Sequence, residues 1–228
     1  MPGGQTTVRE AYTADRPLPP GGRPWVGLCM VSSIDGSTVL DGASAGLSSD
    51  IDREVLLTLR SIADMIIVGA GTVRAEGYGP PRKPGQRIGV VTRSGEIDPS
   101  LPLFVSGAGF LIMAEDSPDV SIESVRAGIG EVDLSLALTR LPGRPRFVQA
   151  EGGASLNGTL AAADLLDEIN ITTSPLLVGG DGARATTHAP QLEHRFRLAH
   201  LIEEESYLFS RYVRAEARTS ALPDSSRR

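Results

Sequence analysis

Short apolar runs separated by turn residues recur along the chain, and their spacing constrains the fold more than any other feature. The runs at 25–31, 65–68, 87–91, 109–113, 146–149 and 169–173 have the composition of buried strands. Helical patterns interrupt this series, and strands connected through helices pair in parallel. The sequence therefore predicts an α/β fold with a mostly parallel sheet.

Two segments carry the helical signals. From Ile51 to Ile62 the apolar residues recur at helical spacing, and Ser49 with Asp52 supplies the chemistry of an N-terminal cap. A second helix is expected to begin near residues 152–153 and to run toward Leu166. Both helices follow the turn residues that separate them from neighbouring strands.

The C-terminal region has a different pattern. Apolar residues alternate with polar or small ones over 196–202, and a second strand-like run covers 207–213, which predicts an antiparallel hairpin that closes the sheet. One domain is expected over 24–214. Residues 1–23, rich in Gly, Pro and charge, are interpreted as an extended arm without its own core, and residues 215–228 as a disordered tail.

Composition excludes several classes of protein. The net charge of −6 and the 4 % aromatic content argue against a nucleic-acid-binding surface. No apolar stretch is long enough for a transmembrane helix. The single cysteine, Cys29, excludes an internal disulfide framework, and no ligand cluster accompanies the histidines, so no metal is expected. These features predict a cytoplasmic protein whose partner is a small molecule, with no role for membrane or nucleic acid.

The segment 42–46, Gly-Ala-Ser-Ala-Gly, matches the G-x-S-x-G pattern of a serine hydrolase. That pattern needs a strand directly before the serine and a helix directly after it, whereas this match lies in a Gly/Ser/Asp-rich region. We favour a loop here. A serine hydrolase that uses Ser44 is the alternative.

Two glycine-rich segments follow predicted strands. The segment 69–74, Gly-Ala-Gly-Thr-Val-Arg, lacks the third glycine of a dinucleotide fingerprint, so a plain turn and a cofactor-binding loop fit it about equally well. The segment 151–156, Glu-Gly-Gly-Ala-Ser-Leu, joins a strand to a helix and offers backbone N–H groups to a pyrophosphate. After a third strand, Thr92 and Arg93 supply a hydroxyl and a guanidinium that suit a 2′-phosphate, which predicts NADPH over NADH.

In combination, several segments resemble the reductase (C-terminal) domain of the bifunctional riboflavin-biosynthesis deaminase–reductase family. These segments are 31–36, 59–60, 64–73, 151–153, 166–168 and 175–182, and the resemblance covers about residues 24–214. It implies a single-domain dihydrofolate-reductase-like fold with helices on both faces of the sheet. The zinc signature of the deaminase half is absent from the sequence, so the chain looks like a reductase alone.

The resemblance also implies an activity and a set of site residues. The activity is NADPH-dependent hydride transfer to 5-amino-6-(5-phosphoribosylamino)uracil, in a homodimer that pairs through sheet edges. Asp35 matches the residue beside the reacting carbon and is the predicted catalytic residue, and Ser44, Arg60 and Glu151 match substrate contacts. Ser33, two residues before Asp35, is also expected to bind substrate. The positions that match cofactor contacts are Ser32, Gly46, Thr72, Glu76, Thr92, Gly153, Ala154, Ser155, Leu156 and Asn157. The glycine-rich segments and the 2′-phosphate argument above add Gly69, Gly71, Gly152 and Arg93 to the expected cofactor-binding residues.

The chain departs from the family pattern in two places. Cys29 stands where such reductases usually have a lysine. The family's Asp-Asp-Pro-x-Leu-Thr-x-Arg segment, which holds the phosphoribosyl group, is replaced by residues 76–82, Glu-Gly-Tyr-Gly-Pro-Pro-Arg, in which Arg82 is the basic side chain. A dihydrofolate or pterin reductase on the same scaffold is therefore the alternative.

Overall fold

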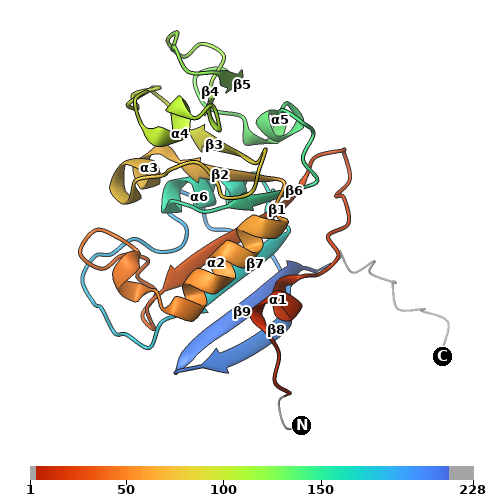
Figure 1. The fold of residues 1–228 in the computed structure, drawn as a ribbon, viewed down its shortest axis with the longest axis vertical. Helices are drawn as coiled ribbons and strands as arrows, with labels where there is room; N and C mark the ends of the chain where they lie inside the picture. Colours follow the sequence, from red (N-terminus) through yellow and green to blue (C-terminus); the bar gives the residue numbers. More distant parts are fainter. Residues whose placement is uncertain (1–3, 216–228) are drawn as a thin grey trace, which may run out of the picture.

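The computed structural model describes residues 4–215, and within them the strands form one mixed sheet. The strands are β1 Trp25–Ser32, β2 Met65–Gly69, β3 Arg87–Val91, β4 Gly109–Met113, β5 Ser124–Arg126, β6 Phe147–Ala150, β7 Glu168–Thr173, β8 Phe196–Glu204 and β9 Tyr207–Arg214. Their order across the sheet is β5-β4-β3-β2-β6-β1-β7-β9-β8 (Figure 1). Neighbours from β5 to β7 are parallel, and β9 is antiparallel to both β7 and β8. The predicted α/β class, mostly parallel sheet and C-terminal hairpin are confirmed.

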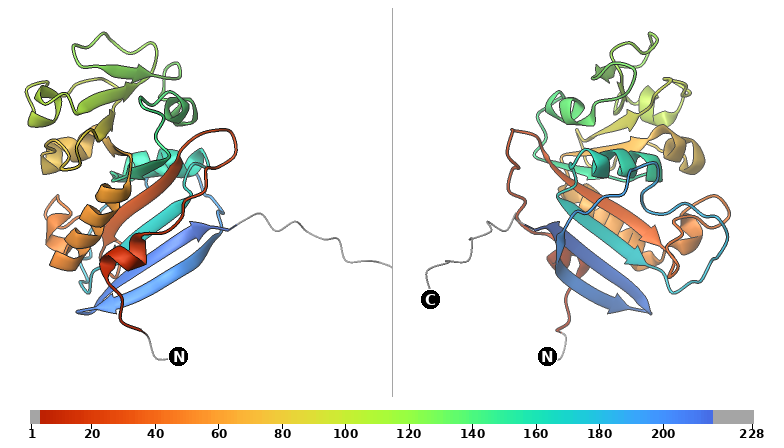
Figure 2. Two further views of the ribbon diagram at one scale, coloured as in Figure 1. Left: turned by 45° about the vertical axis from the view of Figure 1, so that its right-hand side comes forward. Right: turned by 180° about the vertical axis from the view of Figure 1, so that it is seen from behind.

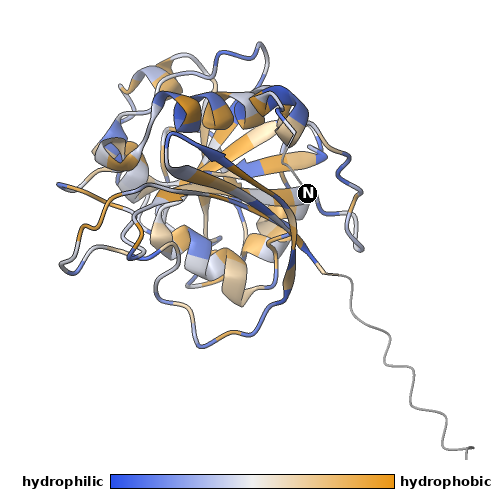
Figure 3. Ribbon diagram, turned by 90° about the horizontal axis from the view of Figure 1, so that it is seen from below, coloured by the Kyte–Doolittle hydropathy of each residue, from blue (hydrophilic) through white to orange (hydrophobic). Residues whose placement is uncertain are grey.

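Helices cover both faces of the sheet, as Figures 1 and 2 show for α2 and α6. The helices are α1 Val8–Tyr12, α2 Asp50–Ile62, α3 Ala70–Glu76, α4 Pro102–Val105, α5 Leu134–Thr139 and α6 Ala154–Ala162, with a 3-10 turn at Ala45–Leu47. Successive strand residues point to opposite faces: Ile67 packs in the core under α5 and α6, and Ile66 in the core under α3 and α4. Because both faces are buried, β2 and β4 are apolar along their length (Figure 3).

Helix α2 has the boundary that its sequence predicts. The Ser49 hydroxyl accepts a hydrogen bond from the backbone N–H of Asp52, which caps the helix. Val55 and Leu59 are buried against Trp25 and Phe147 of the sheet. The polar face that remains carries Arg60 in the last turn, beside the carboxyl end of β6.

Two local expectations need correction, and three short elements were not predicted. The segment 70–76 is helix α3, which begins directly after β2, so it is neither a plain turn nor a free loop. Helix α6 ends at Ala162, short of Leu166, because the chain turns at Asp164 (φ 57°) into β7. The short elements α4, α5 and β5 gave no sequence signal that we recognised, because their few residues span too little of a helical or strand period.

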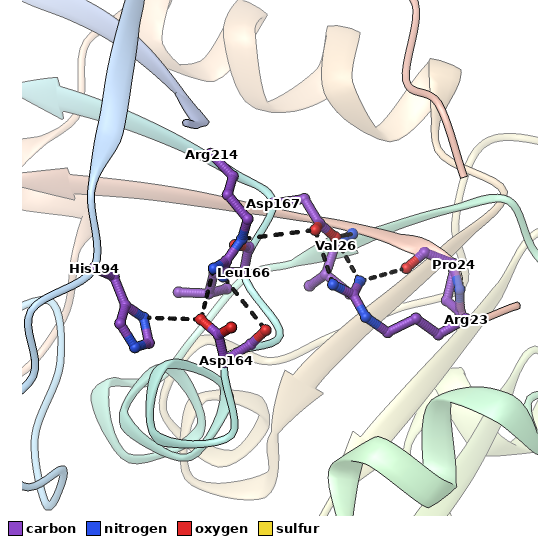
Figure 4. Close-up of polar contacts among 8 residues, drawn as sticks. All are labelled: Arg23, Pro24, Val26, Asp164, Leu166, Asp167, His194 and Arg214. Atoms are coloured by element: carbon purple, nitrogen blue, oxygen red, sulfur yellow. Dashed lines mark hydrogen bonds and ion pairs between the residues drawn. The ribbon is translucent and has the colours of Figure 1, made fainter. Parts of the chain in front are cut away.

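The N-terminal arm is not extended throughout. Thr7 and Glu10 form a capping box that starts the one-turn helix α1, and Tyr12 is only 2 % exposed. Further along the arm, the Arg23 guanidinium donates to both oxygens of Asp167, at 2.6 and 2.9 Å, and Asp167 also accepts from the N–H of Val26 (Figure 4). The arm therefore packs on the domain. The predicted tail, apart from Ala215, lies outside the described residues.

No helix in the described part of the chain is long and apolar enough to cross a membrane.

Candidate active site

The predicted site residues gather where parallel strands end. Ser33 and Asp35 follow β1, Thr92 and Arg93 follow β3, and residues 151–157 follow β6. Since β2, β6 and β1 are neighbours with the same direction, their carboxyl ends meet at one edge of the sheet. Ligands of open α/β sheets bind outside this edge.

The two glycine-rich segments are in contact there. The N–H of Gly69 donates to the Gly152 carbonyl at 2.6 Å. A Cβ on Gly153 would lie 2.9 Å from Thr72 Oγ1, and a Cβ on Gly69 would lie 3.3 Å from the Gly153 nitrogen, whereas the space around Gly71 is open. The start of α3 therefore lies against the start of α6, and glycine at 69 and 153 permits that approach.

In the first turn of α6, the groups available to a ligand are mainly backbone N–H groups, because the side chains of Leu156 and Asn157 are buried. Leu156 is buried in the core, and Asn157, fully buried, donates through Nδ2 to the Ala185 carbonyl at 2.7 Å. Ser155 Oγ lies 3.1 Å from His188 Nδ1. Leu156 and the Asn157 side chain therefore stabilise the fold. The groups that remain available to an anion are the backbone N–H groups in the first turn of α6, which begins at Ala154.

Glu151 and Arg60, two predicted substrate residues, form a buried ion pair. Arg60 Nε donates to Glu151 Oε1 at 2.7 Å and Nη2 to Oε2 at 2.6 Å, while the Glu151 side chain is 3 % exposed. Two residues that sequence reasoning missed complete the cluster: Gln149 Nε2 donates to Oε1 at 3.0 Å and the Tyr78 hydroxyl to Oε2 at 2.9 Å. Gln149 had a signal, a polar residue inside a buried strand, but Tyr78 had none.

Tyr78, in this cluster, and Cys29, near it, are both neutral at physiological pH. Burial, and next the Glu151 carboxylate, raises the pKa of Tyr78 well above its ordinary value of 10.0. Burial, followed by the charges of Asp52 and Glu151, likewise raises the pKa of Cys29 well above 9.0. Cys29, which replaces the family's lysine, therefore brings neither a cation nor a thiolate to the site.

Asp35 holds two loops together. Its Oδ1 accepts from the Ser33 hydroxyl at 2.5 Å and from the Val178 N–H at 3.2 Å, and its Oδ2 accepts from the Gly179 N–H at 2.6 Å. The Ser33 hydroxyl, followed by the Gly179 and Val178 N–H groups, lowers the pKa of Asp35 to about 2. The exposed carboxylate is thus ionised at neutral pH and fixes the loop after β7 beside the loop after β1.

Ser44 and Glu76, predicted from the family for substrate and cofactor, contact each other: Ser44 Oγ donates to Glu76 Oε1 at 2.6 Å. Ser44 precedes a 3-10 turn and follows no strand, and the three histidines of the described chain contact Ser155, Asp164 and Tyr12 instead. The serine-hydrolase alternative is therefore wrong. Gly46 packs closely against Leu40, since a Cβ on Gly46 would lie 2.9 Å from Leu40 Cδ2.

Thr92 and Arg93 differ in exposure. Thr92 is buried, and its hydroxyl accepts from the Gly95 N–H at 3.2 Å, which closes the turn after β3. Arg93 is exposed, so its guanidinium is accessible to an anion. Ser32 ends β1, and its carbonyl accepts from the Ser174 N–H.

Two cavities lie away from this edge. One of about 310 Å³ lies among α1, α2 and the hairpin, lined by residues that include Tyr12, Ile51 and Phe209. The other, of about 290 Å³, lies beside α4 and includes Phe104 and Glu123. Neither of these two cavities is lined by a predicted site residue.

The fold and this glycine-lined edge define a class of protein, the single-domain α/β proteins of dihydrofolate-reductase type. Residues 24–207 match the family model of the RibD C-terminal domain, and the chain belongs to that family. The resemblance found in the sequence is confirmed.

Curated relatives agree with this membership. The chain is 28 % identical over 204 residues to the 2,5-diamino-6-ribosylamino-4(3H)-pyrimidinone 5′-phosphate reductase of Methanothermobacter thermautotrophicus, a match that covers 81 % of this chain and 93 % of that one. It is 30 % identical over 167 residues to the riboflavin biosynthesis protein RibD of Mycobacterium tuberculosis, covering 70 % of this chain. That match spans 44 % of the RibD length, so the chain corresponds to less than half of that relative.

Solved structures show the same fold. A pyrimidine reductase-like protein from Corynebacterium diphtheriae superposes with a TM-score of 0.79 at 22 % identity, covering 92 % of this chain and 100 % of that one. A dihydrofolate reductase from Enterococcus faecalis superposes with a TM-score of 0.52 at 11 % identity, covering 84 % and 97 %. The expected dihydrofolate-reductase-like architecture is confirmed.

Proposed function

We propose that the chain is an NADPH-dependent reductase of a phosphoribosylaminopyrimidine in riboflavin biosynthesis. The substrate is 5-amino-6-(5-phosphoribosylamino)uracil or its 2-amino counterpart, the pyrimidinone that gives the Methanothermobacter relative its name. The ring-opened sugar presents an imine-like C1′: this carbon gains a hydride and the attached nitrogen gains a proton, so the imine becomes an amine. The nicotinamide, when bound, supplies the hydride, and the protein aligns the reactants.

The observation that carries this proposal is the contact between the starts of α3 and α6 at the carboxyl edge of the sheet. Because residues 69, 71 and 153 are glycines, no side chain at these positions separates the backbone from a ligand. The N–H groups at the start of α6 suit a pyrophosphate, so these residues fit a dinucleotide. Among solved structures with this fold, the Enterococcus enzyme was determined in complex with NADP(H).

We assign the heterocycle to Glu151, which is a buried carboxylate at the mouth of a central strand. Both a 2-aminopyrimidin-4-one and a uracil carry a ring N–H that a carboxylate oxygen accepts. Asp35 we treat as a positioning residue: its pKa of about 2 makes it a poor proton donor at neutral pH, and its hydrogen bonds fix residues 178–179. The proton donor is therefore a group other than Asp35.

The proposal is tested by NADPH oxidation with three substrates: the phosphoribosylaminouracil, its 2-amino counterpart and dihydrofolate. We expect turnover with at least one phosphoribosylaminopyrimidine and none with dihydrofolate. Turnover of dihydrofolate alone would support the pterin alternative, which the altered segment 76–82 motivates. Absence of turnover with all three would refute the reductase.

Selection of NADPH over NADH is assigned to Arg93, with Thr92 shaping the turn. In Arg93→Ala the affinity for NADPH should fall about 10- to 100-fold, since one charge-assisted hydrogen bond to the 2′-phosphate is lost, and that for NADH should not change. Fluorescence titration with both cofactors measures this, with Arg53→Ala, exposed on α2, as the matched control. An equal loss for both cofactors would contradict the assignment.

We also propose a cytoplasmic homodimer. The edge strand β8 and its partner β9 expose Leu198, Leu201, Leu208 and Tyr212, which supports pairing at this end of the sheet. Analytical ultracentrifugation is the measurement, and a monomer at micromolar concentration would contradict the dimer.

A further inference from the structure

The Glu151 carboxylate is saturated by donors from its own chain. Each oxygen accepts two hydrogen bonds, Oε1 from Arg60 and Gln149, and Oε2 from Arg60 and Tyr78. An ionised carboxylate offers about four lone-pair positions. A ligand N–H therefore reaches Glu151 only by replacing one of these donors.

The donors differ in how firmly they are held. Arg60 makes a two-pronged ion pair from helix α2, and Gln149 is fully buried within β6. Tyr78 stands in the segment between α3 and β3, with glycine on each side. Gly77 has φ +67°, and no atom lies within 4 Å of a Cβ built on Gly77 or on Gly79. Tyr78 is therefore the one donor of the cluster that comes from a loop, with open space beside both flanking glycines, while its ring is buried in the core that contains Ile66 and Val73.

Replacement of Tyr78 leaves the charges of the cluster balanced. Burial, and then the Glu151 carboxylate, raises the pKa of Tyr78, so the hydroxyl is a neutral donor at any physiological pH. A neutral N–H on a ligand takes its place without any change in charge. Replacement of Arg60 would instead leave the buried Glu151 carboxylate without its counter-ion, which costs more.

We propose that Tyr78 is a specificity-determining residue: in the free protein its hydroxyl occupies the Glu151 oxygen that accepts the N–H of the heterocyclic substrate, and binding exchanges one donor for the other. This inference rests on the proposed function. The ligand class is a planar heterocycle with an N–H on its recognised edge. A heterocycle with only acceptors there leaves Tyr78 in place and binds weakly.

The first test is the steady-state kinetics of Tyr78→Phe, which removes the competing donor and keeps the ring. We expect KM for the phosphoribosylaminopyrimidine to fall about 2- to 10-fold, the equivalent of one neutral hydrogen bond, with NADPH affinity unchanged. Tyr207→Phe is the matched control, because Tyr207 packs against Phe209 on β9 and makes no hydrogen bond to Glu151. An unchanged or higher KM in Tyr78→Phe would overturn the inference.

A second test does not need turnover. The chain has four tyrosines, so protein labelled with 3-fluorotyrosine should give a resolvable ¹⁹F NMR spectrum, in which the Tyr78→Phe variant identifies the Tyr78 signal. Addition of the aminopyrimidine to the protein should shift that signal, and an N-methylated analogue without the N–H should not. A Tyr78 signal that responds equally to both would overturn the exchange. Wild-type protein without turnover in the assay above would refute the proposed function instead, so the two failures are distinct.

Discussion

Two buried glutamates, Glu151 and Glu168, have similar surroundings and different positions in the sheet. Glu168 is 0 % exposed and accepts from Arg16 at 2.8 Å, Arg211 at 3.0 Å and Asn170 at 3.0 Å. Glu151 is 7 % exposed and accepts from one arginine, a glutamine and a tyrosine. Burial and ion pairing alone do not distinguish them.

The two glutamates lie at opposite ends of their parallel strands, and this position distinguishes them. Glu168 begins β7, at the amino edge of its parallel neighbours, and its arginines come from the N-terminal arm and from β9. Glu151 follows β6 at the carboxyl edge, and Tyr78 reaches it from a loop. Both glutamates have packed partners, since the Tyr78 ring lies in the core, but only Glu151 lies at the carboxyl edge, where ligands of open α/β sheets bind, and only Glu151 has a partner from a loop. We therefore treat Glu168 as structural and Glu151 as functional.

The largest effect is expected from Glu168→Gln. This change leaves two buried guanidiniums, those of Arg16 and Arg211, without an anion, which should lower the free energy of unfolding by about 3–5 kcal/mol. Urea denaturation measures it, and Glu205→Gln in the exposed hairpin turn is the control, expected within about 0.5 kcal/mol of wild type. The KM of the folded variant should match that of wild type. A raised KM would show that Glu168 also affects substrate binding, which would contradict the distinction between Glu168 and Glu151.

The same pair predicts how stability depends on pH. Burial raises the pKa of Glu168, but Arg211 and Arg16 outweigh it and hold the pKa below the ordinary value of 4.5. A carboxyl group whose pKa is lowered on folding stabilises the protein above its unfolded pKa, and that contribution is lost as the pH falls through the folded pKa. Wild type should therefore lose stability below about pH 4.5 more steeply than Glu168→Gln. Parallel acid denaturation curves would contradict this.

A smaller effect on stability and a larger one on substrate binding are expected from Glu151→Gln. Arg60 is 27 % exposed, so water compensates part of the lost ion pair. The loss of a charged acceptor should raise KM for the heterocycle about 10- to 100-fold, with NADPH affinity unchanged. Steady-state kinetics and cofactor titration separate the two, and Glu168→Gln is the control. A change in NADPH affinity with an unchanged KM for the heterocycle would indicate that Glu151 contacts the cofactor and not the substrate.

Sequence periodicity identifies the strands because both faces of this sheet are buried. The bounds of β3 and β4 match their apolar runs, since each run is flanked by turn residues. Helix α3 escaped prediction because Gly69–Gly71 has the composition of a turn, and contact with α6 overrides that local preference. Helix α1 escaped because its five residues are too few for a periodic signal.

The candidate site is predictable only where motif and strand end coincide. Glu151 follows a buried strand directly, so its place at the sheet edge follows from the pattern. Its partners lie 91 and 73 residues away along the chain, at Arg60 and Tyr78, and the pairing depends on packing that no local pattern contains. Asp35 was expected at this edge, but its hydrogen bonds to residues 178 and 179 were not foreseen, because they join two loops.

Asp35→Asn should have the smallest effect, on kcat alone. An asparagine offers one acceptor oxygen, and its NH₂ group would face one of the backbone N–H groups that the carboxylate now accepts, so residues 178–179 should shift. Such a displacement should lower kcat on the order of tenfold, with NADPH affinity unchanged. Because the pKa of Asp35 is about 2, neither wild type nor variant should show a kcat limb from this residue between about pH 5 and 8. Asp41→Asn, exposed in the next loop, is the control. Near-normal kcat in Asp35→Asn would mean that the loop keeps its place without the carboxylate, and the contrast between the two edges would then rest on Glu151 and Glu168 alone.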